Sequence, residues 1–136
     1  MIRRFYRALS LRRFSREEDG AATIEAVLWL PFYIMLFGLL VDVSMIFHGQ
    51  SKLLRIVQDA NRNMSIGRLT TNSAVQDFVI ARAGSMSKDP KATTVTSAGL
   101  ILTTASVPMT DLDLFGVASV FKNVRMTVQA EHLMEY

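Results

Sequence analysis

The sequence predicts an α+β fold: a long N-terminal transmembrane helix that continues as an amphipathic helix, a short second helix and a small antiparallel sheet. Two observations carry this prediction. Residues 26–41 read AVLWLPFYIMLFGLLV and contain no charged side chain. Residues 124–131 alternate strictly between apolar and polar side chains, which is typical of a half-buried strand. The 136 residues leave room for one small domain besides the helix.

The apolar segment predicts a transmembrane helix over residues 21–47. No Lys or Arg lies between Ala21 and Gly49, and the only acidic residues there are Glu25 and Asp42. Sixteen uncharged helical residues rise ~24 Å, slightly less than the ~30 Å hydrocarbon core, and residues 21–47 cover that core. A buried helix of a soluble domain is the alternative, but the rest of the chain offers no segment to cover so apolar a surface on all sides.

The tail before this segment is basic and predicts the orientation. Residues 1–20 contain six arginines and three acidic residues, so the positive-inside rule places them in the cytoplasm as a leader. Residues 48–136 then form an extracytoplasmic α+β domain. A secretory signal peptide fits less well, because Glu25 opens the apolar run and no A-x-A-like site follows it. Residues 21–136 hold equal numbers of basic and acidic residues, which argues against nucleic acid as a partner.

Helical spacing of apolar residues continues beyond the predicted membrane segment. One face carries Ile46, Leu53, Val57, Ala60 and Met64. The opposite face carries Gln50, Lys52, Arg55, Asp59, Asn61 and Arg62. The pattern predicts an amphipathic helix to about Ile66, kinked or loosened at Pro31, weakened at Gly38 and Gly49, and stopped at Gly67.

The remaining elements are shorter. Capping-box spacing in Ser73-Ala74-Val75-Gln76 predicts a second helix from Ser73 to about Ala83, ended by Gly84. We expect strands at residues 100–107 and 124–131, and a third at residues 92–97 that forms a hairpin around residues 97–99. The apolar, irregular segment 111–121 is expected to contain a helical turn at residues 112–115.

The chemistry-bearing residues are few. The chain has no cysteine, and its two histidines, His48 and His132, lack metal-ligand spacing. No phosphate-binding loop, dinucleotide fingerprint or nucleophile elbow is present. We therefore expect no enzymatic activity, no cofactor and no metal.

The junction of leader and helix is the most informative part of the sequence. It reads Gly20-Ala21-Ala22-Thr23-Ile24-Glu25, and a carboxylate at the start of an apolar helix is costly unless something compensates it. If the chain were cut after Gly20, Glu25 would be the fifth residue and would lie one helical turn from the new amine of Ala21. That carboxylate could pair with the amine of a neighbouring subunit and set the stagger between helices.

A basic leader, a glycine, four residues, a glutamate and an apolar helix with Pro31 resemble the processing site of type IV pilins, and in detail that of TadE-like pseudopilins of the tight adherence (Flp-type) pilus. The resemblance implies cleavage between Gly20 and Ala21 by a prepilin peptidase, and a registration role for Glu25. It also implies a bacterial inner-membrane location, and a non-catalytic minor pilin or pseudopilin whose partners are membrane lipids, other pilins or pseudopilins, and the assembly platform. Ala26 stands where major Flp pilins carry tyrosine, which favours the pseudopilin interpretation.

Alternatives remain at this stage. The chain could be an uncleaved single-pass scaffold or envelope sensor in which Gly20 is a linker and Glu25 caps the helix. Asp42 is interpreted as an interface residue at the outer end of the span, or as an intramembrane acid that pairs with another subunit. The aromatic residues Trp29, Phe32, Tyr33 and Phe37 are expected to contact partner helices or lipid.

Overall fold

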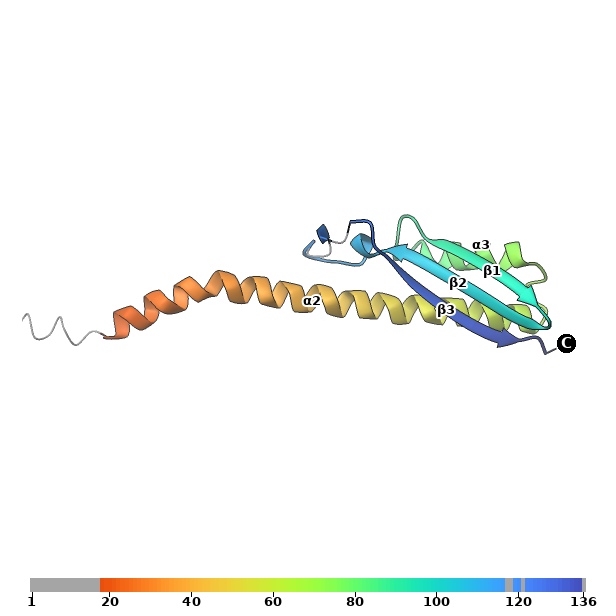
Figure 1. Cartoon of the computed structure of the whole chain (residues 1–136), viewed down its shortest axis with the longest axis horizontal. Helices are drawn as coiled ribbons and strands as arrows, with labels where there is room; N and C mark the ends of the chain where they lie inside the picture. The colour runs from red at the N-terminus through yellow and green to blue at the C-terminus, as the bar shows by residue number, and fades with distance from the viewer. Residues whose placement is uncertain (1–17, 117–118, 121, 136) are drawn as a thin grey trace, which may run out of the picture. The chain divides into compact units, whose positions relative to one another are not determined.

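The structure, a computed structural model, describes residues 18–116, 119–120 and 122–135. Its elements are α2 (Glu18–Ser65), α3 (Asn72–Ala83), β1 (Lys91–Ser97), β2 (Leu100–Pro108), the short 3-10 helix η1 (Met109–Asp111) and β3 (Arg125–Leu133) (Figure 1). The predicted α+β class is confirmed. Residues 1–17 of the predicted leader lie outside the described residues. The chain divides into two compact units, residues 1–37 and residues 38–136, and each is described by itself.

Helix α2 includes the apolar segment and the amphipathic segment that follows it. Pro31 lies inside the helix and does not end it. The predicted stop at Gly67 is confirmed: Gly67 has φ 77°, and the N–H groups of Gly67 and Arg68 donate to the carbonyls of Met64 (3.0 Å) and Asn63 (2.8 Å). Glycine adopts this left-handed conformation without the steric cost that other residues meet, so the chain turns here.

The three strands form one antiparallel sheet in the order β1-β2-β3. The predicted hairpin joins β1 and β2, with Ser97 paired to Leu100. Its two central residues, Ala98 and Gly99, have φ values of 51° and 78°, as a type I′ turn requires. Strand β3 begins at Arg125 and runs to Leu133, so the predicted strand was placed one residue too early and ended two too soon.

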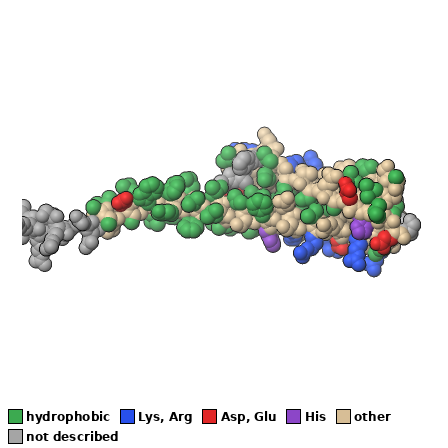
Figure 2. All heavy atoms as spheres, turned by 60° about the horizontal axis from the view of Figure 1, so that its bottom comes forward, with side chains coloured by type: hydrophobic (Ala, Val, Ile, Leu, Met, Phe, Trp, Pro, Cys, Tyr) green, Lys and Arg blue, Asp and Glu red, His purple; other side chains and the backbone are tan. Residues whose placement is uncertain are grey.

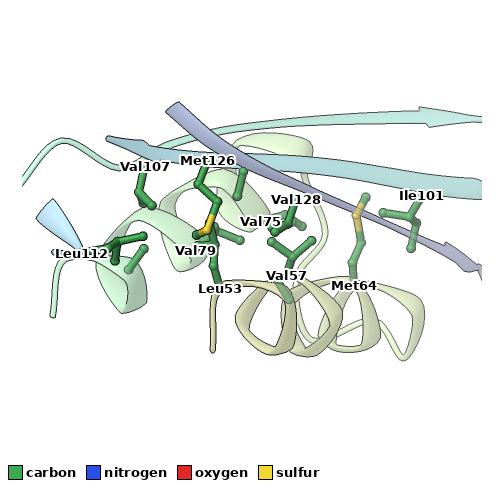
Figure 3. Close-up of a cluster of buried hydrophobic side chains, with 13 residues drawn as sticks. Leu53, Val57, Met64, Val75, Val79, Ile101, Val107, Leu112, Met126 and Val128 are labelled. Atoms are coloured by element: carbon green, nitrogen blue, oxygen red, sulfur yellow. The ribbon is translucent and has the colours of Figure 1, made fainter. Parts of the chain in front are cut away.

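Both helices of the second unit pack on one face of this sheet. The amphipathic part of α2 contributes its predicted apolar face, and α3 contributes Val75, Val79 and Ala83 (Figure 3). The sheet contributes alternate residues of β2 and β3, namely Ile101, Ala105, Val107, Met126 and Val128. This two-layer core follows from the period of about 3.6 in the helix and of two in the strands.

Asn61 corrects the predicted polar face of α2. It is buried at 1% exposure, and its side-chain NH₂ donates to the Ala130 carbonyl of β3 at 2.9 Å. Its side-chain oxygen accepts from the Thr103 hydroxyl of β2 at 2.5 Å, and Thr103 lies 3.0 Å from the Thr94 hydroxyl of β1. Asn61 therefore connects the helix to all three strands. The sequence pattern placed Asn61 on the solvent-facing side because it grouped this residue with the charged Lys52, Arg55 and Arg62. Those three side chains are exposed, whereas Asn61 is not.

Two predicted helix starts were wrong. Helix α3 is capped by Thr71, whose hydroxyl accepts from the Ala74 N–H at 3.2 Å, and not by Ser73. The helical turn after β2 is η1 at residues 109–111, not at 112–115. It forms where Pro108 ends the strand, and the Met109 N–H donates to the Val124 carbonyl at 3.1 Å, which closes the base of the β2–β3 connection. Residues 117, 118 and 121 of the predicted irregular segment lie outside the described residues.

Candidate functional site

The first half of α2 exposes almost nothing but apolar side chains. Among the described residues, one helix is long and apolar enough to cross a membrane by length and composition, and none of its most apolar window is buried in the chain. Figure 2 shows hydrophobic side chains along the visible face of this helix. A core helix would bury one face against the rest of the protein, so the exposed apolar surface favours a lipid environment.

The three predicted site residues lie on the first turns of this helix. Gly20 is the third residue of α2, and apart from its own stretch of helix no atom of the described residues lies within 4 Å of the position that a Cβ would take. Ala21 and Glu25 are exposed, and they lie four positions apart, about one helical turn. The bond after Gly20 lies near the start of the described part of α2.

An aromatic cluster follows one turn later. The ring centroid of Trp29 lies 5.6 Å from that of Phe32 and 6.4 Å from that of Tyr33, and Phe32 and Tyr33 are 6.0 Å apart. All three side chains remain about half exposed. Since helical neighbours three and four positions apart share a face, the cluster gives this side of the helix a continuous aromatic surface.

Asp42 is buried and bonded within its own chain. It is 1% exposed, and its Oδ1 accepts from the backbone N–H groups of Leu114 (2.9 Å) and Phe115 (2.8 Å). These bonds within its own chain take the place of the pairing with another subunit, and the interpretation as an interface residue at the outer end of the span stays a prediction. The acid stabilises the β2–β3 connection, because two backbone donors of an irregular segment find their acceptor there.

Two glycines of α2 lie against side chains of the same β2–β3 connection. Gly49 is buried, and a Cβ built on it would lie 2.8 Å from Leu112 Cδ2, closer than side chains approach. Gly38 lies against the Phe115 ring, with 3.8 Å between a built Cβ and the ring. From the sequence, both glycines were predicted to weaken the helix. At Gly49 the missing side chain instead makes room for Leu112.

Asp111 ties the start of the connection to the loop after α3. Its Oδ2 accepts from the Ser87 hydroxyl at 2.7 Å and from the Lys88 N–H at 2.9 Å. These bonds, the hydroxyl contributing most, hold the pKa of Asp111 below its usual value of 3.8. The carboxylate is therefore the form that the fold stabilises.

A shallow groove between α2 and α3 is lined by four basic side chains. It is lined by Lys52, Arg55, Arg62 and Arg82, together with Asp59 and two uncharged residues. The sequence predicted the α2 residues on a polar face, and the fold adds Arg82, whose guanidinium lies 4.8 Å from the centre of the Phe78 ring. In the described part of the chain, no group of three or more His, Asp or Glu side chains could hold a metal ion.

These features define a class of protein: a small two-layer α+β body carrying one exposed apolar helix of membrane-spanning length. Comparison with protein families gives the particular relationship. The family model described as TadE-like protein matches residues 20–62, and the resemblance inferred from the sequence is confirmed for this stretch. The match relates the chain to proteins associated with the Tad pilus and the membrane. No curated protein and no solved structure matches the chain.

Sequence reasoning found the junction residues but missed the partner of Asp42. Leu114 and Phe115 lie more than seventy positions further along the chain, and they use backbone N–H groups, which carry no residue-specific signal. The signal in the sequence was an acidic residue, Asp42, in an otherwise apolar helix. It called for a donor without saying where that donor lay.

Proposed function

We propose that the chain is a minor pilin or pseudopilin that takes part in assembling a tight adherence (Flp-type) pilus. It acts without catalysis of its own, and a prepilin peptidase removes residues 1–20 as a cytoplasmic leader. Residues 21–47 cross the bacterial inner membrane, and residues 48–136 form the periplasmic domain. The observation that carries the proposal is the TadE-like match, which begins at Gly20 and includes Glu25 and the apolar helix.

The geometry of the junction supports this processing. The bond between Gly20 and Ala21 lies in the first turn of α2, and nothing described crowds Gly20. Because Gly20 has no side chain, a peptidase can approach the backbone closely at this bond. Cleavage would create an α-amine at Ala21, and a positive charge at a helix N-terminus opposes the helix dipole. The carboxylate of Glu25, one turn away, offsets that charge.

The exposed apolar helix supports assembly. Its side chains from Ile24 to Phe37 have no covering partner within the described unit. In the membrane lipid covers them, and in an assembly the same surface packs against neighbouring helices. Glu25 then pairs with the amine of an adjacent subunit and fixes the register, because separating the two buried charges is costly.

Mass spectrometry of the N-terminus tests the processing step. We expect a chain beginning at Ala21 when the protein is produced together with a prepilin peptidase, and an intact leader when the peptidase is absent. Gly20→Val is the matched variant: its branched side chain should block the close approach of the peptidase and leave the leader in place. Ala22→Val, two positions away, places the same side chain outside the scissile bond and should still be cut.

An intact leader in the native host would contradict the processing step. The chain would then be better described by the alternative function, an uncleaved single-pass scaffold or envelope sensor. If the protein is cleaved in its host but a strain that lacks it still forms normal pili, the pilus role is contradicted.

A further inference from the structure

The connection between β2 and β3 exposes a group of apolar side chains. Leu114 is 66% exposed, Phe115 62% and Val120 81%. The segment 114–121 contains no charged residue, and Asp113 and Lys122 flank it. Small soluble domains seldom gather this much apolar surface on one irregular segment unless it contacts a partner or a membrane.

This segment is fixed against the part of α2 that belongs to the same unit. Its backbone donates to Asp42, its Phe115 ring contacts Gly38, and Leu112 packs on Gly49. Figure 1 shows the connection beside α2. The contacts hold Leu114 and Phe115 at the level of residues 38–49, which overlaps the outer end of the predicted membrane segment 21–47.

The helix surface at this level is also apolar and exposed. Val41, Val43, Met45 and Phe47 all remain accessible. Both the connection and the helix therefore expose apolar side chains at this level of the unit.

We propose that the β2–β3 connection is a second membrane contact, in which the side chains of Leu114, Phe115 and Val120 insert into the outer leaflet at the boundary of headgroups and acyl chains. The proposal rests on the membrane placement of α2 and not on a role in the pilus. Asp113 and Lys122 then lie among the headgroups, where charged side chains remain hydrated.

The contact with Asp42 favours lipid over water as the surroundings. Where water is scarce, an irregular segment is tolerated only if its backbone N–H groups find partners within the protein. The two N–H groups at Leu114 and Phe115 share Asp42 Oδ1. The same bonds stabilise the charge of the carboxylate in otherwise apolar surroundings. In water either group could have bonded to solvent, so the buried pair meets a need that a membrane boundary creates.

Fluorescent labelling of single cysteines tests this proposal. The chain has no native cysteine, so each variant carries one site. Leu114→Cys and Val120→Cys are labelled with an environment-sensitive dye in the full chain, reconstituted into phosphatidylcholine and phosphatidylglycerol vesicles. Phe47→Cys, 64% exposed on α2, is the reference for a lipid-facing site, and Val95→Cys, 53% exposed on β1, is the reference for water.

We expect the two loop dyes to show the blue shift and the quenching by spin-labelled lipid that Phe47→Cys shows, whereas Val95→Cys is quenched only by aqueous iodide. Iodide quenching of the loop dyes alongside lipid quenching of Phe47→Cys overturns the proposal and leaves the membrane placement of α2 intact. If Phe47→Cys also escapes lipid quenching, that placement fails as well. Loop dyes shielded from both quenchers, but exposed when excess lipid dilutes the protein, would show that a second copy covers the segment, which also overturns the proposal.

Discussion

At the scale of single residues, Asp42 shows how one acid can organise a distant segment. Replacing it with Ala leaves two backbone donors without their acceptor, at a cost of about 1.5–3 kcal/mol in the free energy of opening the connection. We predict faster hydrogen exchange at the Leu114 and Phe115 amides in Asp42→Ala, measured by NMR in detergent micelles. Asp42→Asn keeps a side-chain oxygen and should retain most of the protection.

Ser44→Ala is the control for this experiment, because Ser44 is an exposed neighbour whose hydroxyl donates to the Leu40 carbonyl of the same helix. Its exchange pattern should match that of the unmodified chain. Equal exchange in all four proteins would mean that Asp42 does not hold the connection.

Asp111 makes the same body sensitive to acid. Its pKa is lowered in the folded state, so its contribution to stability is fully present above the usual value of 3.8 and is lost as the pH falls through the lower, folded pKa. Ser87→Ala removes the hydroxyl that contributes most, so the pKa of Asp111 should rise toward 3.8 and the stability that the protein loses on acidification should become smaller. NMR titration of the Asp111 carboxyl checks this. An unchanged titration in Ser87→Ala would show that the backbone donor of Lys88 is sufficient.

At the scale of secondary-structure elements, the polar contacts of Asn61 determine how α2 sits on the sheet. Asn61→Leu keeps the branching of the side chain, although Leu is larger, and has no polar atoms, so it leaves the Ala130 carbonyl without its donor. We expect the free energy of unfolding of the domain to fall by about 1–3 kcal/mol in urea titrations. Asn63→Leu is the matched control, because the side-chain NH₂ of Asn63 donates to the Asp59 carbonyl of the same helix at 2.9 Å, in an exposed position. It should change stability by less than about 0.5 kcal/mol.

The elements differ in how far the sequence predicts them. Hydrophobic period alone predicts α2, its buried face from Leu53 to Met64 and the alternation in β3, because each depends on local spacing. The hairpin is also local: Ala98-Gly99 supplies the two positive φ angles. The burial of Asn61, the role of Gly49 and the partners of Asp42 were missed because their surroundings are built by residues 103, 112 and 114, far along the chain. Long-range packing decides such positions, and spacing carries no record of it.

The same limit applies to the candidate site. Gly20, Ala21 and Glu25 are contiguous in sequence, so a pattern over six residues suffices to propose them, and the family match begins at the first of them. Their roles depend on a peptidase and on neighbouring subunits, which no single chain contains. The β2–β3 connection required the fold, because its position beside α2 follows from the register of β2 with β3.

At the scale of the whole molecule, the proposed assembly depends on the carboxylate of Glu25, which is exposed in the single chain. Glu25 is exposed on α2, and its proposed partner is the amine of Ala21 in an adjacent subunit. We predict that Glu25→Ala is processed after Gly20 and reaches the membrane at normal levels, yet abolishes or strongly reduces pili counted by electron microscopy. Removing one member of a buried charge pair leaves the other uncompensated, at a cost of about 3–5 kcal/mol per contact.

Asp59→Ala removes one negative charge from an exposed position of the same helix outside the predicted membrane segment, and it should leave piliation unchanged. Glu25→Gln separates charge from size: it keeps the length and polarity of the side chain but cannot neutralise an ammonium group, so it should behave like Glu25→Ala. Normal piliation in Glu25→Gln would show that the side chain acts through hydrogen bonding or packing, and the register between subunits would then have to come from the aromatic surface of Trp29, Phe32 and Tyr33. Loss of processing in Glu25→Ala would instead assign the carboxylate to recognition by the peptidase.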